Sequence, residues 1–133
     1  LTAEEFDIIK KHPEMGYEIL KPIRSFEHIL DGVLYHHENP DGSGYPHGLR
    51  GDEIPLFARI IHVVDVFDAL SSQRSYRDAF TVDRAIRIIR EEAGDKLDAE
   101  IAEVFLREIA NFREEQADAF EAMFPSAKRE VDA

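Results

Sequence analysis

One segment of the chain, residues 38–53, separates two stretches of helical pattern and limits the folds open to this sequence. It contains four of the seven glycines and two of the six prolines: Gly42, Gly44, Gly48, Gly51, Pro40 and Pro46. Neither a helix nor a strand tolerates residues of this kind at such density. We therefore expect a structured loop, and long loops in compact domains usually carry function.

Before this loop, apolar residues recur at helical spacing in two runs. The first run predicts a helix over residues 3–20, opened by a capping box of Thr2 and Glu5. The second predicts a helix that Ser25 caps and that ends near the pair His36-His37. Two histidines are thus expected where the second helix meets the loop.

After the loop, three more helices are expected. One begins at Pro55 and is apolar on most sides up to Leu70, as is typical of a central helix. The next begins at Thr81 and ends near Gly94, and the last begins after Asp98. No run alternates convincingly enough for a strand, so the predicted class is all-α, a bundle of about five helices.

The last helix becomes rich in charge before the chain ends. We expect one domain over residues 1–115, with 116–133 forming the helix end and a frayed tail beyond Pro125. A further apolar stripe in this end is a candidate docking surface for the bundle: Phe120, Met123 and Phe124.

Composition excludes several kinds of protein. With 133 residues, 44% of them hydrophobic, the chain can bury one core. The net charge of −12 argues against nonspecific binding to DNA or to an anionic membrane, and no apolar run approaches the roughly 20 residues of a membrane span. The absence of cysteine rules out disulfides, iron–sulfur clusters and thiol nucleophiles, and favours a reducing compartment, the cytoplasm.

Histidines and aspartates in four regions could converge on metal ions. They are His12, the pair His36-His37, Asp41 in the loop, and Asp65 with Asp68 on the central helix. Neutral imidazoles and carboxylates are ligands for iron, manganese or zinc where thiols are absent. Adjacent histidines on a helix point about 100° apart, which suits one ion each of a pair. The aspartates share one face of an apolar helix, where a cation would offset their desolvation.

Each of these features also has an ordinary explanation. A lone histidine such as His12 is more often a surface or core residue than a ligand, and we give His28, His47 and His62 that explanation. A histidine pair can be a solvated helix end, and an acidic pair can be a cap or a salt-bridge partner. Their joint occurrence is what favours a metal site.

The residues of the loop carry a family signature. Residues 36–46 read HHENPDGSGYP, which resembles the HD-GYP domain signature HHExxDGxGYP at every specified position. The resemblance extends upstream to His12-Pro13 and downstream through Asp65–Leu70 to Arg77, and it covers roughly residues 1–112. It implies an all-α, metal-dependent phosphodiesterase that hydrolyses the bacterial second messenger cyclic di-GMP to the linear dinucleotide pGpG or to GMP.

The resemblance also assigns roles to individual residues. It implies two or three divalent metal ions, iron or manganese, in a binuclear or trinuclear centre. The implied ligands are His12, His36, His37 and Asp65, which holds the first aspartate position of the DxxDAL segment, while Asp68 is a candidate catalytic residue. The implied substrate contacts are Asp41, Gly42, Gly44, Tyr45, Pro46, Arg74 and Arg77. Arginine suits phosphate because its planar fork binds two oxygens. The ordinary explanation is a tight turn for the glycines and a solvated helix end for the arginines.

The sequence also departs from the family pattern. No His-Asp dipeptide occurs in the 133 residues, and the chain opens at Leu1 on a segment that normally follows that dyad. We therefore expect an N-terminally incomplete domain that lacks part of the metal site. Smaller departures surround the site: His62 in place of a small residue, Ser75 in place of proline, and Asp95 and Ala99 in the usual GTxFDP segment.

Three functions remain open at this point. The first is the C-terminal part of a working cyclic di-GMP phosphodiesterase. The second is a degenerate HD-GYP module that binds a nucleotide or a protein without turnover, and the third is another phosphohydrolase of the HD superfamily. The resemblance further implies an upstream receiver or sensor domain, and a homodimer is left open.

Overall fold

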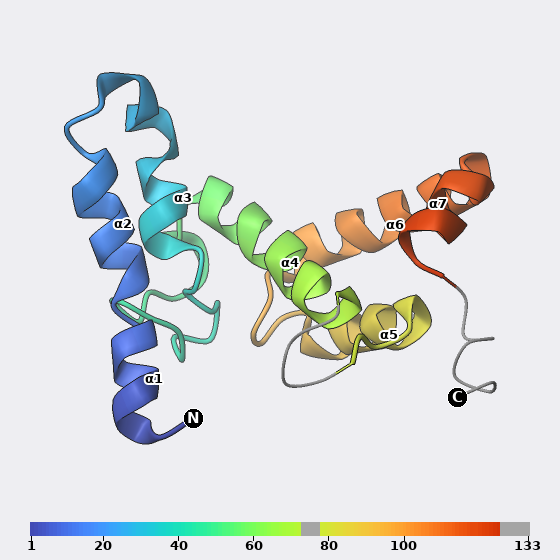
Figure 1. The fold of residues 1–133 in the computed structure, drawn as a ribbon, viewed down its shortest axis with the longest axis horizontal. Helices are drawn as coiled ribbons and strands as arrows, with labels where there is room; N and C mark the ends of the chain where they lie inside the picture. Colours follow the sequence, from blue (N-terminus) through green and yellow to red (C-terminus); the bar gives the residue numbers. More distant parts are fainter. Residues whose placement is uncertain (73–77, 126–133) are drawn as a thin grey trace.

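The computed structural model describes residues 1–72 and 78–125 and is built from helices, with no strand among them (Figure 1). The all-α prediction is confirmed. In chain order the elements are α1 (Ala3–Ile9), α2 (His12–Leu20), the 3-10 helix η1 (Arg24–Ile29), α3 (Leu30–Tyr35), the 3-10 helix η2 (Gly51–Glu53), α4 (Leu56–Ser71), α5 (Val82–Glu92), α6 (Ala99–Glu115) and α7 (Ala117–Met123).

The expected single helix over 3–20 is two helices. Its capping box is present, with the Glu5 amide donating to Thr2 Oγ1 at 3.1 Å. The break follows from Pro13, which has no N–H to donate to the carbonyl of Ile9 four residues earlier. That carbonyl accepts instead from His12 Nδ1 at 2.6 Å. The prediction of one continuous helix was wrong for this reason.

The second predicted helix begins with 3-10 geometry in η1 and becomes α-helical only in α3. Ser25 does not cap it, because the residue at the N-cap is Ile23 and no side chain bonds there. The end of the helix agrees with the prediction, since α3 stops at Tyr35 and His36 occupies its C-cap.

The main core lies where α4 packs against α5, α6 and α7 (Figure 1). Thr81 and Asp98 cap α5 and α6 as predicted, each accepting a backbone N–H in the first turn. The buried apolar cluster consists of Val63, Phe67, Val82, Ala85, Ile89, Leu97, Ala102 and Phe120.

Helix α4 is central but only half covered. Its other neighbour is α3, which itself packs on α2. Between these neighbours, apolar side chains of α4 remain exposed, and a cavity of about 500 Å³ opens between α4 and α6. The exposed apolar residues of α4 are Leu56, Phe57, Ile60 and Val64.

The long C-terminal helix breaks at Gln116, and α7 packs back on the bundle. Phe120 is 3% exposed and Phe124 lies edge-on to Phe67, so two of the three predicted docking residues reach the core. Met123 is exposed. The predicted frayed tail beyond Pro125 lies outside the described residues.

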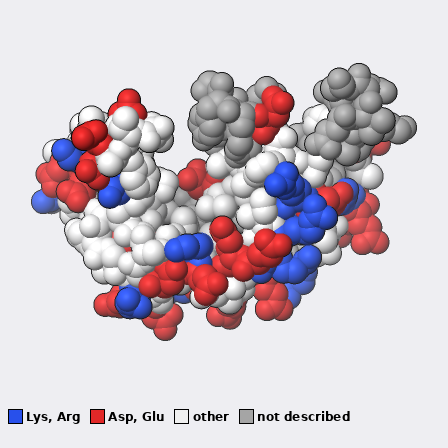
Figure 2. Space-filling view, turned by 90° about the horizontal axis from the view of Figure 1, so that it is seen from below, with Lys and Arg blue, Asp and Glu red and all other residues white. Residues whose placement is uncertain are grey.

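The surface is predominantly acidic. Figure 2 shows acidic side chains scattered over the visible face with fewer basic ones between them, in keeping with the net charge of −12. None of the described helices is both long and apolar enough to cross a membrane.

Candidate metal centre

Three histidines from two packed helices converge at one point. His12 begins α2, and His36 and His37 follow the last residue of α3. Each offers a ring nitrogen, and these nitrogens lie within 4.8 Å of one another. All three residues were predicted as metal ligands from the sequence, and the packing of α2 on α3 brings them into one cluster.

Backbone carbonyls set the ring orientation of two of the three. His12 Nδ1 lies 2.6 Å from the Ile9 carbonyl, and His36 Nδ1 lies 2.9 Å from the Val33 carbonyl. A carbonyl can only accept, so each Nδ1 carries the proton and each Nε2 keeps its lone pair. This is the arrangement that metal-binding histidines adopt in proteins.

His37 completes the donor set. Its Nε2 lies 3.1 Å from His12 Nε2. Burial, reinforced by the neighbouring His36 and His12, lowers the pKa of His37 to about 4. The ring is therefore neutral near pH 7, which is the form that binds metal, and two facing nitrogens at this distance require a shared proton or a cation.

One carboxylate of α4, that of Asp65, lies near this cluster. Asp65 and His36 line the same cavity of about 340 Å³ between α3 and α4. Asp65 and Asp68 line a second cavity of about 310 Å³ along α4. Among the described residues the tight cluster contains the histidines alone, so Asp65 approaches the site through the shared cavity, and Asp68 lies one turn further along α4.

The loop over residues 38–53 places an aromatic ring on the site. Tyr45 stacks on His37 with 5.0 Å between ring centroids and 18° between ring planes, and its N–H donates to the His37 carbonyl at 3.2 Å. Phe6 of α1 meets the Tyr45 ring edge-on at 6.3 Å. Burial raises the pKa of the Tyr45 hydroxyl, and the charge of Asp65 adds to this. The next peptide bond, to Pro46, is cis.

Two glycines of the signature are required by the geometry of the turn. Gly42 has a φ of +83°, which side chains rarely adopt. A Cβ on Gly44 would overlap the backbone of Asn39 and His37. The tight-turn explanation is thus correct for both residues, and their contact with substrate stays a prediction.

Sequence reasoning gave no role to Glu38, which the structure shows to be buried beneath the loop. Its carboxylate is 1% exposed and accepts three backbone N–H groups: those of His47 at 2.6 Å, Gly48 at 3.1 Å and Leu49 at 2.9 Å. The sequence did contain a signal for this role, because the signature specifies a glutamate directly after the histidine pair.

Asp41 is engaged within the loop. Its carboxylate accepts from the Ser43 amide at 2.9 Å, from the Ser43 hydroxyl and from Lys96 at 3.0 Å. The hydrogen bonds from Ser43, with that from Lys96, lower the pKa of Asp41 to about 2. Its predicted contact with substrate is not needed to explain its position.

Two predicted phosphate ligands cannot be placed. Arg74 and Arg77 lie outside the described residues. His62, given an ordinary role from the sequence, is a buried core histidine, and burial lowers its pKa.

Residues 1–101 match the family model described as "HD domain". The chain belongs to the HD domain family. The matched region contains the three clustered histidines as well as Asp65 and Asp68 of α4. The HD-GYP resemblance drawn from residues 36–46 is confirmed by this match and by the relatives of the chain.

Those relatives are bacterial phosphodiesterases. The cyclic di-GMP phosphodiesterase response regulator RpfG of Xanthomonas campestris is 44% identical over 110 residues, which cover 80% of this chain and 29% of that protein. A cyclic di-GMP phosphodiesterase of Thermotoga maritima is 42% identical over 111 residues, covering 80% and 30%. The 3′3′-cGAMP-specific phosphodiesterase 2 of Vibrio cholerae is 39% identical over 110 residues, covering 80% and 21%. The chain therefore spans less than a third of the length of these relatives.

A solved structure shares the fold. The crystal structure of a cyclic GMP-AMP-specific phosphodiesterase of Vibrio cholerae superposes with a TM-score of 0.67 at 22% identity, covering 92% of this chain and 30% of that one. This likeness supports the helical architecture of the HD domain.

Proposed function

We propose that this chain forms the metal-binding part of a phosphodiesterase that hydrolyses cyclic dinucleotides, with cyclic di-GMP as the first candidate substrate. The observation that carries the proposal is the histidine cluster, whose three donor nitrogens lie within 4.8 Å of one another. The names of the relatives support the reaction class, since they act on cyclic di-GMP or on 3′3′-cGAMP.

The donor set fits divalent iron or manganese. Neutral imidazoles with Nδ1 held by carbonyls present Nε2 to a cation, and a carboxylate supplies negative charge. His12, His36 and His37 are the proposed ligands, and Asp65 is the proposed carboxylate because it shares a cavity with His36. When bound, two or three such ions would activate water as Lewis acids and neutralise phosphate charge.

The residues around the cluster have separate proposed tasks. Tyr45 keeps the His37 ring in place by stacking on it and presents a hydroxyl and a ring edge to a nucleotide. Asp68 is the candidate for holding a proton near the leaving 3′-oxygen. Arg74 and Arg77 are proposed to bind the phosphates in the bidentate manner typical of arginine.

The test is hydrolysis by the full-length protein supplied with Mn²⁺ or Fe²⁺. Cyclic di-GMP and 3′3′-cGAMP are incubated separately, and pGpG and GMP are quantified by chromatography. We expect turnover of at least one substrate and its loss in His37→Ala, because that change removes one of the clustered donors. The control is His28→Ala, which removes an exposed histidine outside the cluster.

Other outcomes would favour the remaining functions. Tight binding of a cyclic dinucleotide without any turnover would indicate a degenerate binding module. Turnover of other phosphate esters, with neither cyclic dinucleotide hydrolysed, would indicate a different phosphohydrolase of the HD superfamily.

Three features of the whole protein are part of this proposal. A receiver or sensor domain in the same polypeptide is a prediction from the family resemblance. A homodimer and a cytoplasmic location remain predictions from the sequence.

A further inference from the structure

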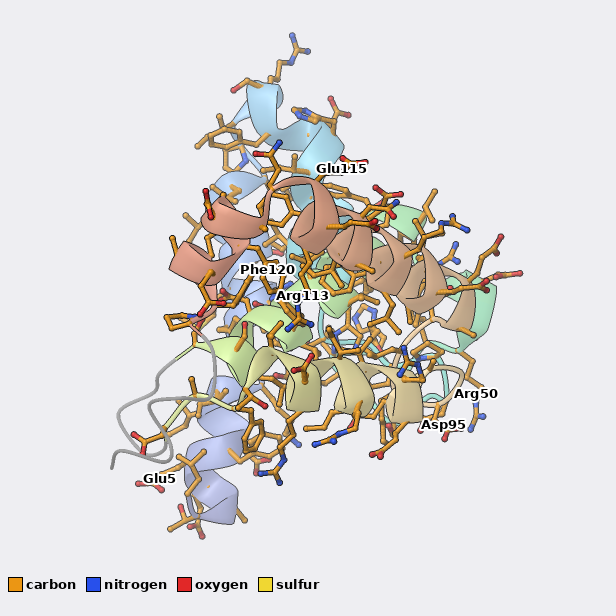
Figure 3. All side chains as sticks on the ribbon, turned by 90° about the vertical axis from the view of Figure 1, so that its right-hand side faces the viewer. Glu5, Arg50, Asp95, Arg113, Glu115 and Phe120 are labelled. Carbon is orange, nitrogen blue, oxygen red and sulfur yellow. The ribbon has the colours of Figure 1, made fainter. Side chains whose placement is uncertain are left out.

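Two loops that lie far apart in the sequence are bonded to each other beside the histidine cluster. The first is the loop over residues 38–53, and the second is the turn between α5 and α6, residues 93–98. The Asp41 amide donates to the Asp95 carbonyl at 3.1 Å, and Asp41 also forms an isolated bridge with Arg50. Figure 3 shows Arg50 and Asp95 near each other at one corner of the molecule.

Side chains close this junction into a ring of hydrogen bonds. His62 Nε2 of α4 lies 2.8 Å from Asn39 Oδ1 and 3.0 Å from the Lys96 carbonyl. Asn39 Nδ2 donates to Ser43 Oγ at 3.0 Å, and Lys96 Nζ donates to the same oxygen at 2.6 Å. The ring therefore joins α4, the first loop and the α5–α6 turn.

The directions of these bonds are mutually consistent. Both partners of His62 Nε2 are acceptors, so this nitrogen carries the proton. Ser43 Oγ accepts from Asn39 and Lys96 and donates to Asp41. The hydroxyl group thereby uses its one donor and both of its acceptor positions. Lys96 Nζ also donates to Asp41 Oδ2 at 3.0 Å. The side chains of Asn39, Asp41 and Ser43 are thus all bonded in this junction.

In the sequence, two residues of the ring lie between His37 and Tyr45, whose side chains stack at the histidine cluster. Asn39 follows His37 by two positions, and Ser43 precedes Tyr45 by two positions. A turn held at both Asn39 and Ser43 keeps the spacing between the His37 and Tyr45 rings constant. The rings of His12 and His36 have contacts of their own, because their Nδ1 atoms bond to helix carbonyls.

We propose that Lys96 and His62 are positioning residues for the site. They act through Asn39, Asp41 and Ser43 to hold the turn over residues 39–43, so that Tyr45 stays stacked on His37 and faces the cyclic dinucleotide. The part that concerns substrate rests on the proposed function. Lys96 lies at the unspecified position of the GTxFDP segment, outside the signature itself.

The experiment compares Lys96→Met with the conservative Lys96→Arg, which keeps two donors for Asp41 and Ser43. Hydrogen exchange of the Tyr45 amide, measured by NMR, reports the turn without any assay of activity. We expect about tenfold faster exchange at Tyr45 in Lys96→Met and recovery in Lys96→Arg. The Leu49 amide should keep its protection, because buried Glu38 holds it separately.

The kinetic arm uses the full-length protein with Mn²⁺. We expect KM for the cyclic dinucleotide to rise about tenfold in Lys96→Met, with kcat changed less than threefold, because the metal ligands keep their geometry. Lys21→Met is the matched control, since Lys21 is an exposed lysine outside the ring. His62→Leu removes the contact that α4 makes with the ring, and it should also accelerate exchange of the Tyr45 amide.

Two results would overturn the inference. One is unchanged exchange at Tyr45 in Lys96→Met. The other is equal acceleration at Tyr45 and Leu49 together with a lower melting temperature, which would indicate a purely structural role. If the wild-type protein hydrolyses no cyclic dinucleotide, the proposed function fails, and the exchange comparison alone decides the role of Lys96 and His62.

Discussion

At the scale of single residues, the orientation of His12 depends on the proline that follows it. Pro13 cannot donate to the Ile9 carbonyl, and the His12 ring takes the place of the missing amide at 2.6 Å. This contact ends α1 and also fixes the proton on Nδ1. One proline thereby breaks a helix and orients a proposed metal ligand.

Glu38 gives the first prediction. Glu38→Gln should lower the free energy of unfolding by about 2–3 kcal/mol, because a buried carboxylate that accepts three N–H groups becomes an amide with one acceptor oxygen. The measurement is urea unfolding followed by circular dichroism.

The control for this prediction is Glu27→Gln, at an exposed position of η1, which should change stability by less than about 0.5 kcal/mol. Equal effects of the two substitutions would contradict the assigned role of Glu38. Faster exchange of the His47, Gly48 and Leu49 amides in Glu38→Gln would localise its effect.

At the scale of elements, α4 and α6 are joined by a partly buried ion pair. Arg59 of α4 donates to the Ile54 carbonyl at 2.9 Å and to Asp98 at 3.0 Å. Asp98 also accepts the Ile101 amide and so caps α6. The two side chains are only 18% and 16% exposed, so solvent screens the pair weakly. Asp98 therefore both starts a helix and fixes it to its neighbour.

The two roles of Asp98 can be separated by substitution. Asp98→Ala removes both and should cost about 2–3 kcal/mol, whereas Asp98→Asn keeps the cap and should cost about 1 kcal/mol. Thermal and urea unfolding measure the difference.

Thr81→Ala serves as the comparison, because Thr81 caps α5 through the Arg84 amide. It should cost about 1 kcal/mol. If Asp98→Ala cost no more than Thr81→Ala, the bond to Arg59 would contribute nothing measurable.

At the scale of the whole molecule, metal binding and folding should be coupled. The three histidines come from two helices, so an unfolded chain cannot present them together. At a metal concentration 100 times Kd, binding should stabilise the fold by about 2.7 kcal/mol and raise Tm by roughly 10 °C. The measurement is a thermal melt at pH 7.5 with and without Mn²⁺, with a chelator to reverse the shift.

The double variant His36→Ala, His37→Ala provides the control, since it removes two of the three donors. Its Tm should not respond to Mn²⁺, whatever its value without metal. A shift of the same size in this variant would place the metal elsewhere. Protonation of the donor nitrogens competes with metal, so the wild-type shift should be lost as the pH falls toward about 4, the pKa of His37.

Local patterns determined the helical class and the ends of several helices, and they supplied the list of candidate ligands. Caps at Thr2, Thr81 and Asp98, and the histidine pair at the end of α3, are readable because each depends on neighbours within four residues. The break before Pro13 was locally encoded as well, although continuous apolar spacing concealed it.

Tertiary structure alone decided which of these residues meet. His12 and His37 lie 25 residues apart and come together through the packing of α2 on α3. Lys96 reaches Ser43 across 53 residues, and no local pattern predicts that contact. Glu38 is a charged residue whose burial depends on the path of the whole loop. Side-chain chemistry is written in the sequence, whereas long-range neighbours follow only from how the helices pack.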